Sequence, residues 1–151
     1  MSAGPFPRRG GAIPCEVRAD ILDLIARYAN YWEFRLSREW AALFTEDGVF
    51  QDVRGREALE AVCRAAGERA DALRDAIHAQ TNTMLVQVAD DRVVGLTNVV
   101  FGSHEAGVPG SARLTGYGDY HDVFVRTPEG WRFASRRACP HLQEPLPPEL
   151  R

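Results

Sequence analysis

Apolar residues in the first third of the chain recur at steps of three and four, the spacing of one side of a helix. From Pro14 onward they are Val17, Ile21, Leu24, Ile25, Tyr28, Tyr31 and Trp32. Pro14 before this stripe and Glu16 in its first turn suit a helix N-terminus. The pattern therefore predicts a long amphipathic helix that begins near Pro14 and buries the stripe.

Shorter elements are predicted between this helix and the middle of the chain. In chain order they are a short helix carrying Trp40, Leu43 and Phe44, a short strand over 49–53, and a third helix over 56–63 that continues after Gly67 to about Ile77. Thr45-Glu-Asp-Gly48 is expected to end the second helix, because glycine and short polar residues favour turns.

The second half of the chain alternates apolar and polar residues and is rich in Val, Phe, Tyr and Trp, as half-buried strands are. The predicted strands cover 78–88, 92–104, 112–126 and 131–139, with a glycine- and proline-containing loop over 105–111. Asp90-Asp91 is the first hairpin turn, and Pro128 and Gly130 favour a tight turn in the last hairpin. Helices followed by a long-stranded sheet predict an α+β fold in which a curved sheet encloses one pocket.

Length and charge limit the classes of protein that fit. The 151 residues predict one domain over 14–139, with a flexible arm over 1–13 and an extended, proline-rich tail over 140–151. A net charge of −3 gives no basic surface for nucleic acid, and no apolar run approaches the roughly 20 residues of a membrane span. The first residues lack the apolar stretch of a secretion signal, and three widely spaced cysteines favour a reducing cytoplasm.

The absence of one residue type excludes a class of chemistry. All 18 basic residues are arginine, so catalysis through a lysine Schiff base is excluded. No glycine-rich phosphate-binding or dinucleotide-binding motif is present. We therefore expect no cofactor.

Short motifs in a characteristic order identify a family resemblance. They are Ile21-x-x-Leu24-x-x-x-Tyr28, Trp40-x-x-Leu43-Phe44-Thr-x-Asp47-Gly48-x-Phe50, Gly55-Arg-Glu-Ala-Leu59, His78-x-x-Thr81-Asn82, Gly118-x-Tyr120-x-Asp122 and Gly130-Trp-Arg-Phe-x-x-Arg136. Over Glu16 to Arg137 the chain resembles the NTF2-like superfamily, in particular the SnoaL-like polyketide cyclases and their scytalone dehydratase and ketosteroid isomerase relatives. The resemblance implies a conical α+β barrel with an apolar pocket, and homodimers packed through the outer sheet face. It also implies metal-free and cofactor-free proton transfer by Asp, His and Tyr. The superfamily includes pure binding modules, so the fold does not fix the function.

His78 is the first candidate for a catalytic residue. Strict alternation places it on one strand face with Asn82, Met84, Val86 and Val88, a face apolar enough to point inward. A histidine with a pKa near neutral suits proton transfer in such a pocket, and the resemblance places a functional histidine here. The alternative is a structural histidine bonded to a backbone carbonyl.

Asp119 is the second candidate, since alternation puts it on one face with Tyr117 and His121. The opposite face is just as mixed, and comparison with scytalone dehydratase favours the face of Asp119 as the pocket wall. Asp122 is then expected on the outer face, paired with Arg126 or Arg136.

Further candidates come from the first helix and its surroundings. Tyr28 on the buried stripe could donate a hydrogen bond to a substrate carbonyl, although aromatic residues at this spacing are more often core. Glu33 occupies a position where many relatives carry Asp. The segment between Glu33 and Trp40 is also longer than in those relatives. The expected substrate-binding residues are Tyr117, His121, Trp32, Tyr31, Asn82 and Phe50; a metal site of His78, Asp119 and His121 lacks close ligand spacing.

The sequence thus predicts a cofactor-independent enzyme of natural-product metabolism, acting on a hydrophobic, carbonyl-bearing, polyketide-like small molecule. Cyclisation, dehydration or isomerisation through an enol or enolate would use His78 or Asp119 as base and Tyr28 or Tyr117 as donor to the oxyanion. The alternative is a non-catalytic NTF2-like module that binds a small molecule or docks as an accessory subunit. A homodimer is expected in either case.

Overall fold

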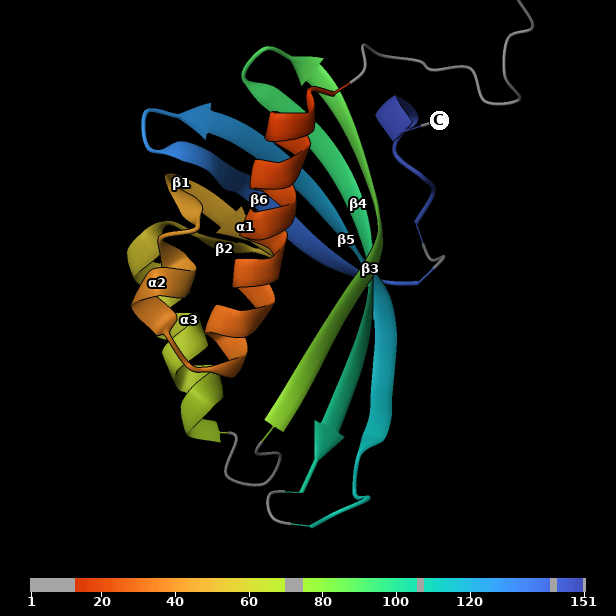
Figure 1. Ribbon diagram of the computed structural model, residues 1–151. Coiled ribbons are helices and arrows are strands. Elements are labelled where there is room, and N and C mark those ends of the chain that lie inside the picture. Colours follow the sequence, from red (N-terminus) through yellow and green to blue (C-terminus); the bar gives the residue numbers. More distant parts are fainter. Residues whose placement is uncertain (1–12, 70–74, 106–107, 142–143, 151) are drawn as a thin grey trace, which may run out of the picture.

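The computed structural model describes residues 13–69, 75–105, 108–141 and 144–150, and within these it places three helices against a six-stranded sheet (Figure 1). The helices are α1 (Cys15–Glu33), α2 (Ser37–Ala41) and α3 (Arg56–Arg69), and a 3-10 helix, η1, covers Pro148–Leu150. The strands are β1 (Phe44–Phe50), β2 (Val53–Arg54), β3 (Asp75–Ala89), β4 (Arg92–His104), β5 (Arg113–Thr127) and β6 (Gly130–Pro140). None of the helices in this part of the chain is long and apolar enough to span a bilayer.

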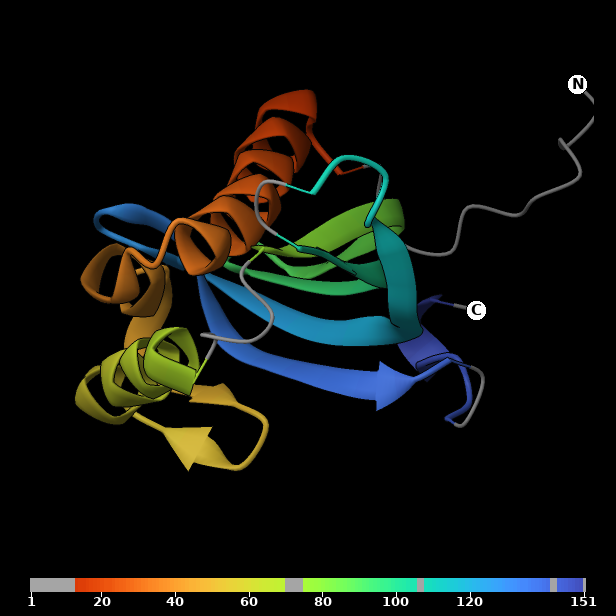
Figure 2. The ribbon, with the colours of Figure 1, turned by 90° about the horizontal axis from the view of Figure 1, so that it is seen from below.

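The sheet is mixed and runs in the order β2-β1-β6-β5-β4-β3. β1 lies parallel to β6, and the other neighbouring strands are antiparallel. The sheet curves around α1 (Figure 2), but within the described residues its end strands β2 and β3 do not pair. The predicted α+β class is therefore confirmed, whereas the sheet is open rather than a closed barrel.

The stripe predicted for the first helix is the one that α1 buries. Its fully buried members are Val17, Ile21, Leu24, Ile25 and Tyr28, while Tyr31 and Trp32 are half-buried. These residues pack on the concave side of the sheet against a layer of aromatic and aliphatic side chains that includes Phe124 and Phe133. Burial of this apolar area is the main term that holds α1 to the sheet.

Three predicted boundaries are wrong. The predicted strand over 49–53 is divided by a turn at Gln51 and Asp52 into the end of β1 and the start of β2. Phe44 does not end the second helix but begins β1, and the Phe133 amide next to it donates to the carbonyl of Leu43 at 2.9 Å, which ties the chain to β6 here. The third helix does not continue to Ile77, because β3 begins at Asp75. The predicted flexible arm lies outside the described residues except for Ile13.

Bulges in two strands change which residues face the helices. In β3, Asn82 and Thr83 together oppose a single residue of β4, and Asn82 has a φ of 52°. In β6, Ala134 is the extra residue between the partners of Phe124 and Val123. A bulge reverses the alternation of faces that follows it. Met84 and Val88, predicted to point inward, are 43% and 42% exposed, and Leu85 is buried instead.

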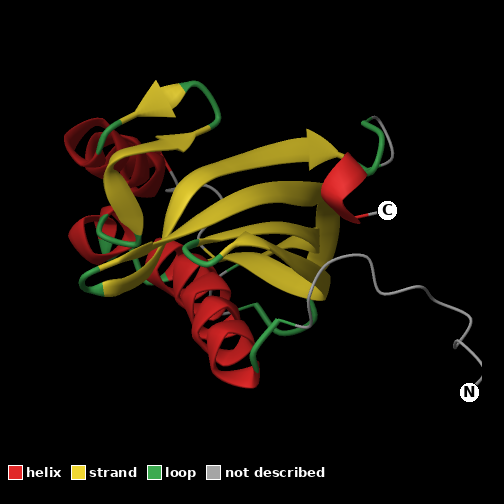
Figure 3. Ribbon diagram, turned by 90° about the horizontal axis from the view of Figure 1, so that it is seen from above, coloured by secondary structure: helices red, strands yellow, loops and turns green. Residues whose placement is uncertain are grey.

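The C-terminal tail lies on the sheet face opposite to the helices (Figures 2 and 3). Glu144 pairs with Arg137 of β6, η1 contacts β3 and β4, and Leu150 is buried. The tail was expected to be extended, but it ends in a 3-10 turn anchored by Leu150. It covers part of the outer face through which the resemblance implies a dimer.

Gly118 is expected to tolerate no side chain, because a Cβ there would lie 2.6 Å from the backbone oxygen of Cys139. Gly118→Ala should lower the free energy of unfolding by about 1–3 kcal/mol, the usual cost of overpacking. Gly116→Ala is the matched control, since its Cβ would meet only Phe101 at 3.7 Å. Urea denaturation of both variants checks this; equal stabilities would contradict the close approach at Gly118.

Candidate functional site

A histidine and a carboxylate meet where the end of α1 crosses the edge strand β3. Glu33, the last residue of α1, accepts a hydrogen bond from the backbone N–H of His78 at 2.5 Å. The same oxygen, Oε1, lies 3.3 Å from Nδ1 of the His78 ring. The edge position of β3 leaves this backbone N–H free of the sheet ladder, so Glu33 can take it.

This pair is largely shielded from water. The side chains of His78 and Glu33 are 12% and 26% exposed. The His78 ring packs edge-on against Phe101 and Trp32, with ring centroids 5.3 Å and 6.4 Å apart. If Nδ1 carries the proton that points to Glu33, Nε2 is left as an acceptor, and no described residue bonds it.

Burial lowers the pKa of His78 below its usual value, and the positive charge of Arg136 lowers it further. Glu33 opposes both effects through its charge and its hydrogen bond, but burial is the larger cause. At neutral pH the imidazole is therefore uncharged, which is the form that can accept a proton.

The lowered pKa of His78 should appear in the stability of the protein. The neutral ring is favoured in the folded state, so its contribution is complete above the unfolded value of about 6.5 and is lost as pH falls through the lower folded-state pKa. Between neutral pH and about pH 5, wild type should lose more free energy of unfolding than His78→Gln, by at most about 1.4 kcal/mol per pH unit. Glu33 and Arg136 are the charged groups that face the ring in the wild type, and both are retained in His78→Gln. An equal fall of the free energy of unfolding with pH in both proteins would contradict the lowered pKa of His78.

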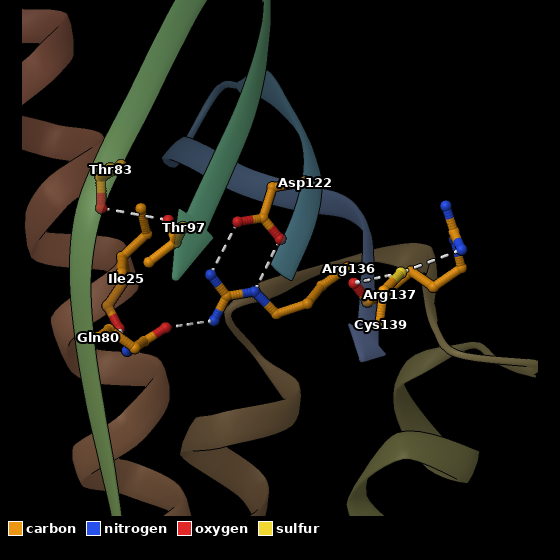
Figure 4. Close-up of polar contacts among 8 residues, drawn as sticks. All are labelled: Ile25, Gln80, Thr83, Thr97, Asp122, Arg136, Arg137 and Cys139. Atoms are coloured by element: carbon orange, nitrogen blue, oxygen red, sulfur yellow. Dashed lines mark hydrogen bonds and ion pairs between the residues drawn. The ribbon is translucent and has the colours of Figure 1, made fainter. Parts of the chain in front are cut away.

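Next to this pair lies a buried ion pair, which Figure 4 shows between β5 and β6. Arg136 donates through Nε and Nη2 to the two carboxylate oxygens of Asp122, at 2.7 and 2.8 Å. Its Nη1 donates to Gln80 at 2.8 Å, and Gln80 donates in turn to the backbone oxygen of Ile25 in α1. Both charged side chains are 0% exposed. The sequence placed Asp122 with an arginine but on the outer face; the β6 bulge turns Arg136 inward.

Aromatic rings surround this guanidinium on the inner side of the sheet. Its carbon lies 4.2 Å from the ring centres of Tyr28 and Tyr120 and 4.5 Å from that of Phe133. Burial raises the pKa of Tyr28 well above its usual value, so its hydroxyl keeps its proton, and it is hydrogen-bonded to Tyr120. Tyr28 is therefore an occupied donor within a packed aromatic layer.

Trp40 carries the unpartnered donor of this layer. Its side chain is fully buried, and among the described residues its indole N–H is the buried side-chain polar atom without a hydrogen-bond partner. The Trp32 ring lies between it and His78, with centroids 5.0 Å and 6.4 Å away. An orphaned buried donor costs about 1–3 kcal/mol, which a ligand carbonyl or a water would recover.

The other candidate base, Asp119, lies on the opposite face of the sheet. Asn98 donates to it at 2.6 Å, and Nδ1 of His141 from the tail lies 2.8 Å away. The inward-facing residues of β5 are Tyr120, Asp122 and Phe124. The predicted face of this strand is therefore wrong, and His141 of the tail is half-buried against Asp119.

The remaining predicted residues divide between the two faces. Trp32 and Phe50 join the aromatic layer near His78. Three others do not: Tyr117 is 69% exposed and His121 shares the face of Asp119, while Asn82 bonds Asn98 on that outer face because of the β3 bulge. Tyr31 lines a separate cavity of about 500 Å³ between α1, α2 and the β5–β6 turn.

Sequence reasoning missed Gln80, Tyr120 and Trp40 as site residues. Gln80 follows His78 by two residues on the same strand face, which alternation alone could have indicated. Tyr120 shares a strand face with Asp122. Because that face was predicted to point outward, Tyr120 was not predicted as a site residue. The orphaned N–H of Trp40 depends on packing and leaves no signal in the sequence.

Three helices on one face of an open, curved, mixed sheet are the arrangement of NTF2-like α+β proteins. The sequence model of the SnoaL-like domain matches residues 14–137. The chain belongs to this SnoaL-like family. Comparison with proteins of curated function finds no match.

Solved structures with the same fold come from several bacteria. Rv3472 of Mycobacterium tuberculosis, a protein of unknown function, is 29% identical, with a TM-score of 0.70 over 81% of this chain and 74% of that chain. An NTF2-like protein with a cystatin-like fold from Novosphingobium aromaticivorans is 26% identical, with a TM-score of 0.71 over 86% and 84%. ActVI-ORFA of Streptomyces coelicolor is 24% identical, with a TM-score of 0.74 over 84% and 96%.

Proposed function

We propose that the protein is a cofactor-independent enzyme that removes a proton next to the carbonyl of a hydrophobic small molecule. The observation that carries the proposal is the largely buried His78, whose Nδ1 and backbone N–H both face Glu33 and whose pKa is lowered by burial. Its membership of the SnoaL-like family and the resemblance to polyketide cyclases favour a polyketide-like substrate.

In this proposal Nε2 of His78 accepts the proton from carbon, and the electron pair moves to the carbonyl oxygen to form an enolate. Glu33 holds the ring and stabilises the imidazolium that forms, and the imidazolium later returns the proton. Trp32 and Phe101 form apolar walls beside the ring. Cyclisation, dehydration and isomerisation share this first step.

A second candidate is a non-catalytic binding module. The polar groups around Arg136 bond one another, as expected of a structural network rather than of groups waiting for a substrate. This observation favours the binding module for that part of the interior, and it does not involve Nε2 of His78.

Exchange of α-protons for deuterium tests the proposal without knowledge of the final product. β-Tetralone, a bicyclic aromatic ketone, is incubated with the protein in deuterated water, and the α-proton signal is followed by proton NMR. We expect loss of the signal at least about 100-fold faster than in buffer alone. Quenching of tryptophan fluorescence by β-tetralone without any exchange would favour the binding module and contradict the enzyme.

A further inference from the structure

Three side chains with metal-binding atoms meet on the outer face of the sheet, away from the His78 site. They are His121 of β5, Cys139 of β6 and Glu144 of the tail. Their ligand atoms all lie within 4.8 Å of one another. Cys139 is buried, His121 is half-buried and Glu144 is exposed.

The register of the two strands explains why these residues meet. His121 is paired with Arg137, and Asp119 with Cys139, so His121 and Cys139 are diagonal neighbours on one face. The β6 bulge precedes both Arg137 and Cys139 and turns them outward, as Figure 4 shows by their position opposite to Arg136. Arg137 binds the Glu144 carboxylate and so holds the tail beside the two strands.

We propose that His121, Cys139 and Glu144 bind a divalent cation of the zinc class. Imidazole nitrogen, thiolate sulfur and carboxylate oxygen are the three ligand types that Zn²⁺ takes in proteins. Three protein ligands leave a fourth tetrahedral position open. The site is independent of the proposed function, because it lies on the opposite face of the sheet.

Arg137 is the group that a cation must displace. Its Nη1 donates to Sγ of Cys139 at 3.1 Å, and both of its terminal nitrogens bond Glu144. The guanidinium thus places a positive charge against two of the three ligands. Binding of the cation requires the guanidinium to swing out, and it releases the thiol proton of Cys139 to solvent.

One of the three proposed ligands, His121, faces a cavity. A cavity of about 420 Å³ is lined by His121 and Arg137, by outer-face residues such as Val94, and by Pro147 and Glu149 of the tail. Water can therefore reach the His121 side of the cluster from this cavity.

Titration with Co²⁺ of protein that carries no affinity tag tests the site. We expect a thiolate-to-cobalt charge-transfer band that saturates at one ion per chain and is displaced by Zn²⁺. Cys139→Ser should abolish the band. Glu144→Gln, at an exposed position, should weaken binding at least about tenfold. Cys15→Ser removes an exposed thiol that is distant in the sequence from Cys139, and it should leave the titration unchanged.

Arg137→Gln identifies the position of the ion independently of the ligand variants. Because it removes the competing positive charge, we expect it to tighten Co²⁺ binding about tenfold. A band that persists in Cys139→Ser, or that disappears in Cys15→Ser, would overturn the proposal. So would an affinity that does not respond to Arg137→Gln.

Discussion

Replacing His78 with glutamine lowers the rate of α-proton exchange into β-tetralone by at least about 100-fold, the usual loss when a general base is removed. Glutamine has no basic nitrogen, yet it fills similar space between Trp32 and Phe101. Its backbone N–H still donates to Glu33, since that contact does not involve the side chain. The free energy of unfolding at neutral pH should therefore change by less than about 1.5 kcal/mol.

Three further variants distinguish the loss of the catalytic base from a general loss of folded structure. His141→Gln and Asp119→Asn alter the outer-face pair and should keep the wild-type exchange rate. Glu33→Gln retains an oxygen that can accept from His78 but loses the charge that holds the ring, so we expect an intermediate loss of at least about tenfold. Full exchange in His78→Gln, or a loss in Asp119→Asn equal to that in His78→Gln, would remove His78 from the role of base.

Asp122→Asn should lower the free energy of unfolding by about 3–5 kcal/mol, because it leaves the fully buried Arg136 without its counter-ion. Asparagine has nearly the same shape as aspartate, so the loss reports charge rather than volume. The remaining partner of Arg136, Gln80, is neutral and cannot replace the carboxylate. Urea denaturation measures the change as a shift of the transition midpoint.

The exposed pair of Asp23 and Arg27 on α1 provides the matched control. These side chains are 61% and 53% exposed and lie 2.6 Å apart. Asp23→Asn removes the same charge in the same kind of ion pair, but water screens it, so the cost should stay below about 1 kcal/mol. Equal losses in Asp23→Asn and Asp122→Asn would contradict the buried position of the Arg136 pair.

The elements whose apolar residues keep one uninterrupted spacing could be predicted from the sequence. The stripe of α1 buries the residues that its spacing indicated, from Val17 to Tyr28, and β4 keeps strict alternation from Val93 to Val99. In both cases the spacing of apolar residues is set by the geometry of one element alone.

The faces of β3 and β6 could not be predicted, because each strand contains a bulge. Asn82 lies in a left-handed conformation that asparagine tolerates, but the sequence around it is an ordinary polar strand. Ala134 carries no such signal. These two residues decide that Met84 points outward and that Arg136 points inward.

Contacts between segments that are distant in the sequence could not be predicted either. His78 and Glu33 were each named from the sequence, but their meeting depends on the angle at which α1 crosses β3. Nothing in the local sequence fixes that angle, since it follows from the packing of the whole aromatic layer. The same is true of the tail, whose return to the outer sheet face depends on contacts of Arg137, Glu144 and Leu150.

The protonation state of His78 is the most direct test of its role as the base, and nitrogen-15 NMR of the imidazole rings measures this state without a substrate. Comparison with His78→Gln assigns the signals. We predict a ring that is neutral at pH 7, protonated at Nδ1 and unprotonated at Nε2, with a pKa below the usual value near 6.5. A ring that is positively charged at neutral pH, or one protonated at Nε2, could not accept a proton from a substrate and would contradict the proposed base.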